Sequence, residues 1–149
     1  MPKEPFLPIS WTNSSLQLLD QRLLPLKKVF LHIESLDETV FAIKEMAVRG
    51  APAIAITGIF GLALGAKAKS GNVSPTDVKN LIKKIHESRP TAVNLSYALK
   101  EAEIRIQNCT TWDSIYTIWE AFGKELMLND LSYNLKLGEN GIKLFDPSN

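Results

Sequence analysis

The sequence reads Arg49-Gly50-Ala51-Pro52-Ala53-Ile54-Ala55 at the point where one helix is expected to end and another to begin. Glycine tolerates the positive φ at which helices stop, and proline suits the first turn of a new helix. The new helix should therefore begin directly beside the Arg49 guanidinium. A helix start offers free N–H groups and the positive end of a dipole, so this junction is a candidate anion site.

A second segment of the same kind follows at Arg89-Pro90-Thr91-Ala92-Val93-Asn94. We expect a helix to start near Pro90 and to continue to about Asn108. Arginine suits phosphate because its planar fork can bond two oxygens at once. Two arginine-bearing helix starts in one small domain therefore predict a site for a phosphorylated ligand. The structural alternative is that each arginine pairs with a carboxylate or caps its own helix.

The segment after Gly50 is apolar from Ala51 to Ala66, except for Thr57. It is shorter than the roughly 20 residues that cross a bilayer, so it predicts a helix buried on all sides and no membrane contact. Three glycines lie nearly on one face of this helix, where another backbone could approach closely. They are Gly58, Gly61 and Gly65.

The segments before the junction predict a small N-terminal sheet. Residues 16–20 and 29–33 are short apolar runs suited to strands, and residues 21–28 join them, so an antiparallel pair is expected. Residues 1–15 contain three prolines and several turn-forming residues, and they are predicted to be irregular. Residues 1–34 form the first predicted unit, a hairpin or small sheet packed on the helices.

Residues 35–144 are predicted to be a helical domain. Ser35 and Glu38 have the spacing of a capping box, and Ser74-Pro75 has the pattern of another helix start. A long helical pattern ends at about Asn140, with Gly141 as its expected stop. Residues 145–149 are predicted to be a linker. The fold class is thus mainly α, a helical bundle with a small N-terminal antiparallel β-sheet.

Composition excludes several classes of function. The formal net charge of +1 and the scattered lysines do not form the basic stripe of a nucleic-acid-binding protein. Cys109 is the only cysteine, and the N-terminus lacks the apolar core of a secretory signal, so we expect a cytoplasmic protein. His32 and His86 have no partner at metal-ligand spacing, so no metal is expected.

Three blocks of the sequence resemble the methylthioribose-1-phosphate isomerase family in order and spacing. They are Leu18–Pro25, Met46–Ile54 and Arg89–Leu95. The pattern of residues 130–141 agrees with the same family, and the resemblance extends from about Trp11 onward. Together the blocks are far more specific than any one of them.

The resemblance implies an aldose–ketose isomerase of methionine salvage. Such an enzyme converts 5-methylthioribose 1-phosphate to 5-methylthioribulose 1-phosphate, with no metal or organic cofactor. The substrate contacts of the family match Arg49, Gly50, Ala51 and Arg89, with Gly50 and Ala51 acting through their backbone.

The resemblance also implies a second domain. Family members continue into a Rossmann-like C-terminal domain that carries the catalytic cysteine and aspartate, and they are expected to form homodimers. This chain resembles only the first domain, and Cys109 does not lie in the cysteine motif of the family. We therefore expect no catalytic residue in this chain, a role in clamping the substrate, and no activity in isolation.

Two alternatives stay open at this stage. The same fold is shared by regulatory subunits of translation initiation factor 2B, which are binding proteins, and by ribose-1,5-bisphosphate isomerases. Ala55 stands where the family usually has glycine, which leaves room for a divergent paralogue. Asp20 and Gln21 are candidates either for polar residues of a cleft or for a turn between strands.

Overall fold

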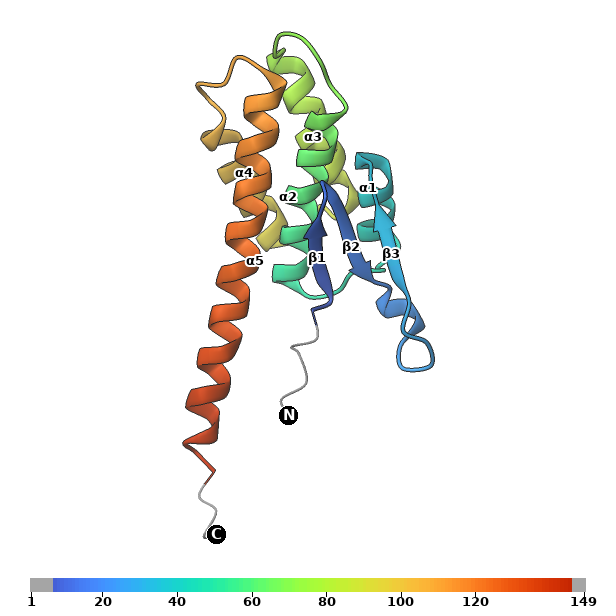
Figure 1. The fold of residues 1–149 in the computed structure, drawn as a ribbon, viewed down its shortest axis with the longest axis vertical. Coiled ribbons are helices and arrows are strands. Elements are labelled where there is room, and N and C mark those ends of the chain that lie inside the picture. The colour runs from blue at the N-terminus through green and yellow to red at the C-terminus, as the bar shows by residue number, and fades with distance from the viewer. Residues whose placement is uncertain (1–6, 146–149) are drawn as a thin grey trace.

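The described residues, 7–145 of the computed structural model, form five α-helices with a three-stranded antiparallel sheet along one side (Figure 1). The predicted mainly α class with a small N-terminal sheet is confirmed. Residues 1–6 and 146–149 lie outside the described residues, as do most of the predicted linker and part of the N-terminus that was expected to lack a signal.

The sheet contains one strand more than the sequence predicts. Its strands are β1 (Ile9–Thr12), β2 (Ser15–Leu19) and β3 (Phe30–Ile33), in the order β1-β2-β3. The expectation of irregular structure through residue 15 is therefore wrong for β1. Trp11 explains the difference, because its ring stacks on Phe60 at 4.5 Å and thereby ties β1 to the helices.

The helices begin at the predicted signals in three cases. The capping box of Ser35 and Glu38 starts α1 (Leu36–Lys44), and Ser74 caps α3 (Pro75–Ser88). The segment after Gly50 forms α2 (Ala51–Lys67). The other helices are α4 (Val93–Arg105) and α5 (Trp112–Ile142), and a short 3₁₀ helix, η1 (Gln21–Leu23), follows β2.

Two predicted boundaries are wrong. α4 starts at Val93 rather than near Pro90, because residues 89–92 first form a turn that is closed by the hydrogen bond from the backbone N–H of Ala92 to the carbonyl oxygen of Arg89. α5 continues through Gly141, which lies inside the helix rather than after it. A glycine inside a helix weakens it by only about 1 kcal/mol relative to alanine, so it need not end the helix.

α2 is the centre of the bundle, as predicted, with every residue from Ile54 to Ala66 buried. Side chains of neighbouring helices, rather than their backbones, occupy the space beside its glycines. Gly58 faces Leu95, Gly61 faces Thr39, and Gly65 faces Leu81. Within the described part of the chain, no helix has both the length and the apolarity needed to cross a membrane.

The contacts beside these glycines give the direction of each helix. Ile85, late in α3, contacts Gly58 and Gly61 of α2, whereas Leu81, about one turn earlier in α3, contacts Gly65 further along α2, so α3 runs antiparallel to α2. Leu95, in the first turn of α4, lies against Gly58, two turns into α2. The starts of α2 and α4 therefore share one end of the bundle with the end of α3. α5 continues past this end in Figure 1.

We expect glycine-to-alanine substitutions at two positions of α5 to have opposite effects on stability. At Gly123 an added Cβ would lie 2.7–3.0 Å from ring carbons of Phe60, so Gly123→Ala should destabilise the fold by about 1–3 kcal/mol. At Gly138 nothing lies within 4 Å, so Gly138→Ala should stabilise the helix by up to about 1 kcal/mol. Urea unfolding of both variants measures the difference, and equal effects would contradict this packing.

Candidate anion-binding site

The junction between α1 and α2 has the predicted geometry. Gly50 is the N-cap of α2 with φ of 97°, a conformation that favours glycine. Ala51 is the first helical residue and Pro52 the second, so proline lies in the first turn as expected. Arg49, Gly50 and Ala51 are all exposed, which leaves this helix start open to a ligand.

Arg89 lies at the end of α3 rather than at the start of α4. It is the C-cap of α3, with φ of −156° and ψ of 77°, and its backbone carbonyl accepts a hydrogen bond from Ala92 at 3.1 Å. Ala92 is the N-cap of α4. A turn of three residues thus separates Arg89 from the helix that it was expected to begin, although Arg89 and the start of α4 lie in the same turn.

The four arginines of the chain fall into two groups, those with a carboxylate partner and those without one among the described residues. Arg22 binds the carboxylate of Asp20, and Arg105 binds Glu125, in each case through two nitrogens. Within residues 7–145, Arg49 and Arg89 form no ion pair. Arg49 has only a long hydrogen bond, 3.4 Å from its Nε to the carbonyl oxygen of Met46. The two predicted arginines thus keep their charge available to a ligand.

The helix starts divide in the same way. α1, α3 and α5 each have a capping Ser or Thr side chain and an acidic residue in the first turn. α2 and α4 have neither. The positive ends of these two helices are therefore not compensated within the described chain, and they are the two that lie beside Arg49 and Arg89. The sequence contained this contrast, since Gly50 and Ala92 have no side-chain oxygen.

Asp20 fills a turn role, one of the two alternatives left open for it. Only 3% of it is exposed, and it caps η1 by accepting a hydrogen bond from the backbone N–H of Arg22. The hydrogen bonds from the Arg22 side chain lower the pKa of the Asp20 carboxyl, and the nearby charge of Arg49 lowers it further, while burial opposes both.

Acid should weaken the fold partly through Asp20. Its pKa is lower in the folded than in the unfolded chain, so its contribution is complete above the unfolded value of about 3.9 and is lost as the pH falls through the folded value. We expect Asp20→Asn to reduce stability at pH 7 and to make the loss between about pH 5 and pH 3 shallower. Urea unfolding across this range measures both. Parallel pH curves for the two proteins would contradict this role of Asp20.

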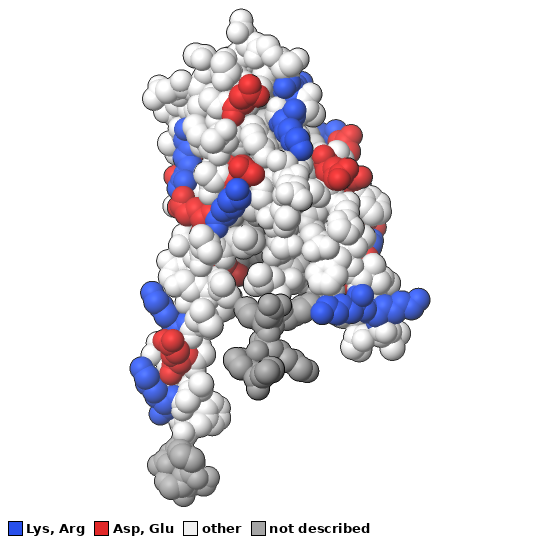
Figure 2. All heavy atoms as spheres, viewed as in Figure 1, with Lys and Arg blue, Asp and Glu red and all other residues white. Residues whose placement is uncertain are grey.

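Chemistry other than anion binding has little support in the described part of the chain. Among its residues, no group of three His, Cys, Asp or Glu side chains could hold a metal ion. His32 is exposed on β3, and His86 is half-buried near the end of α3. On the face shown in Figure 2, basic and acidic side chains are interspersed rather than gathered into a patch of one sign.

Residues 47–148 match the Initiation factor 2 subunit family. The chain belongs to this family. The matched range begins two residues before Arg49 and includes Arg89, so both predicted segments fall inside the part of the chain that defines membership.

Named proteins and solved structures are similar to almost the whole of this chain. Methylthioribose-1-phosphate isomerase of Leptospira biflexa is 60% identical over 97% of this chain and 41% of its own length. The structure of 5-methylthioribose 1-phosphate isomerase from Pyrococcus horikoshii has a TM-score of 0.86 at 28% identity, over 96% of this chain and 42% of its own.

A structure of the translation initiation factor eIF-2B subunit delta from A. fulgidus is equally similar in fold, with a TM-score of 0.86 at 30% identity. The similar region covers 95% of this chain and 42% of the A. fulgidus protein. The chain thus spans about two fifths of the length of these relatives. The resemblance found in the sequence is confirmed, and the similar proteins include both a named isomerase and a named initiation factor subunit.

Proposed function

We propose that this chain is the substrate-clamping domain of a methylthioribose-1-phosphate isomerase. Arg49 and the backbone N–H groups of Gly50 and Ala51 bind the phosphate or sugar oxygens of the substrate, and Arg89 binds from the adjacent turn. The observation that carries the proposal is that, among the described residues, the two arginines without an ion pair lie beside the two helix starts without a side-chain cap. A phosphate supplies the negative charge and the acceptors that this arrangement lacks.

The reaction itself belongs to a further domain in this proposal. The relatives are more than twice as long as this chain, and α5 projects beyond the end of the bundle that carries Arg49 (Figure 1). Its projecting part exposes large apolar side chains, among them Leu135, Leu137 and Ile142. A domain seated against this part of α5 would cover the anion site and exclude water from the substrate.

That second domain would supply the acid, the base and the proton or hydride shift of an aldose–ketose isomerisation. This chain orients the sugar phosphate and neutralises its charge. A homodimer and a cytoplasmic setting remain parts of the proposal, the latter because Cys109 is the only cysteine in the chain. The chain alone is expected to bind the sugar phosphate without turning it over.

The Leptospira biflexa relative allows a direct test of the proposed activity. A chimera in which this chain replaces the matching 145 residues of that isomerase should convert methylthioribose 1-phosphate to the ketose. The isolated chain, labelled with ¹⁵N, should show shifts of the Gly50 and Ala51 amides when methylthioribose 1-phosphate is added. Methylthioribose without the phosphate should leave these amides unchanged.

An inactive but folded chimera, or shifts that do not involve Gly50 and Ala51, would contradict the proposal. A binding role like that of the initiation factor subunit is the second candidate, favoured by the equal structural similarity of the A. fulgidus protein. It predicts a chimera without activity. Arg49 and Arg89 form no ion pair within residues 7–145, and this favours the isomerase, because a scaffold has no need of two uncompensated cations beside uncapped helix starts.

A further inference from the structure

Asp20 is the one charged side chain that is buried within the described residues. It lies at the end of β2 and accepts three hydrogen bonds from Arg22: from the backbone N–H at 3.1 Å, from Nε at 2.8 Å and from Nη2 at 2.7 Å. A carboxylate and a guanidinium paired through two parallel bonds hold each other in one orientation. The Asp20–Arg22 turn is therefore fixed internally.

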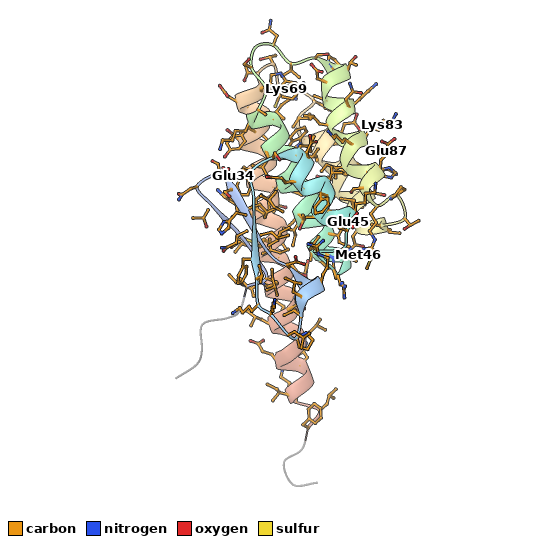
Figure 3. The ribbon with its side chains drawn as sticks, turned by 90° about the vertical axis from the view of Figure 1, so that its right-hand side faces the viewer. Glu34, Glu45, Met46, Lys69, Lys83 and Glu87 are labelled. Atoms are coloured by element: carbon orange, nitrogen blue, oxygen red, sulfur yellow. The ribbon has the colours of Figure 1, made fainter. Side chains whose placement is uncertain are left out.

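This turn is bonded to the segment that carries the anion site. The backbone N–H of Gln21 donates to the carbonyl oxygen of Ala47 at 2.9 Å, two residues before Arg49. The guanidinium of Arg22 lies 5.9 Å from the centre of the Phe41 ring on α1. In Figure 3, Met46 lies at the end of α1 that faces η1. The chain between α1 and α2 is thus held from the side of the sheet.

The segment needs such a restraint because its backbone is not regular. Met46 has φ of 57° and Gly50 has φ of 97°, so two residues with positive φ flank the three residues between them. Conformations of this kind persist where the surroundings fix them. The hydrogen bond from Gln21 to Ala47 fixes the residue directly after Met46, and its donor belongs to the turn that Asp20 holds.

The charges around Asp20 give a second reason why its pair with Arg22 matters for the anion site. A bare carboxylate beside an anion site would repel the ligand. Arg22 neutralises Asp20 by direct contact, which leaves the charge of Arg49 in excess.

We propose that Asp20 is a positioning residue of the anion site. Its pair with Arg22 fixes the turn that is hydrogen-bonded to Ala47, and this bond positions the segment from Ala47 to Gly50, which includes Arg49 and leads into the first amides of α2. The inference rests on the proposed function, because the ligand is the sugar phosphate named there. Asp20 itself does not touch that ligand.

Asp20→Asn tests the first half of the proposal without any ligand. Asparagine has the same size and keeps an acceptor for the Arg22 N–H, but it cannot form the ion pair. We expect hydrogen exchange of the Gln21 amide to become about tenfold faster, since its bond to Ala47 opens more often. Glu125→Gln is the matched control, because it removes a similar two-point pair with Arg105 between α4 and α5 and should leave the Gln21 amide unchanged.

Titration of the folded variants with methylthioribose 1-phosphate tests the second half, and the sign of the effect decides it. Positioning by Asp20 predicts that Asp20→Asn binds about tenfold more weakly. A carboxylate that merely lies nearby predicts tighter binding, because a repulsion is removed. A purely structural role predicts unchanged affinity.

Arg22→Gln should weaken binding in the same way as Asp20→Asn, and Glu125→Gln should not. Tighter or unchanged binding by Asp20→Asn, or an unchanged Gln21 exchange rate, overturns the proposal. If the unsubstituted chain does not bind methylthioribose 1-phosphate, the proposed function fails, while the exchange comparison still decides whether Asp20 holds the segment.

Discussion

Phe60→Ala is expected to destabilise the chain by about 3–5 kcal/mol, the range for truncating a large buried aromatic side chain. Phe60 is fully buried in α2, stacks on Trp11 of β1 and packs against Gly123 of α5. Its removal would therefore leave a cavity where the sheet, α2 and α5 meet. Urea unfolding followed by circular dichroism measures the loss.

Tyr133→Ala is the control for this prediction. Tyr133 is an aromatic residue of α5 that is 65% exposed, so its removal should change stability by no more than about 0.5 kcal/mol. A loss in Phe60→Ala as small as that in Tyr133→Ala would mean that Phe60 does not connect the three elements.

Arg49→Ala is expected to weaken binding of methylthioribose 1-phosphate by about 1.5–3 kcal/mol, the range for a hydrogen bond to a charged group. Arg49 is exposed and forms no ion pair among the described residues, so the stability of the fold should change by less than about 0.5 kcal/mol. Calorimetry of the chain and of the isomerase chimera measures affinity, and urea unfolding measures stability.

Two further variants make this prediction specific. Arg49→Lys keeps the charge but loses the planar fork, so its affinity for methylthioribose 1-phosphate should lie between that of the unsubstituted chain and that of Arg49→Ala. Lys79→Ala removes an exposed cation from the first half of α3, away from the α2 start, and should not change the affinity. An equal loss of affinity in Lys79→Ala would mean that Arg49 acts only through the net charge of the chain and not through a contact with the ligand.

Local signals in the sequence predicted much of the fold. Gly50 and Pro52 marked the start of α2, Ser35 with Glu38 marked α1, and Ser74 marked α3, because each of these signals acts within one helical turn. β1 was missed, since its strand depends on the distant contact of Trp11 with Phe60.

The candidate site was predictable in part. Arg49 and Arg89 could be selected from their neighbours, but whether they have carboxylate partners depends on the tertiary structure. Asp20 and Arg22 are two positions apart in a turn, so their spacing in the sequence was only a weak signal of the ion pair between them. Its bond to the anion-site segment, through Gln21 and Ala47, has no signal in the sequence, because it joins residues that only the fold brings together.

The central position of α2 has a thermodynamic consequence. The same helix that forms the middle of the core begins at the anion site, so a ligand that binds only the folded chain opposes unfolding of the whole bundle rather than of one loop. At a concentration 100 times its Kd, such a ligand adds about 2.7 kcal/mol to the free energy of unfolding. Melting temperature therefore becomes a sensitive reporter for screening sugar phosphates against this chain.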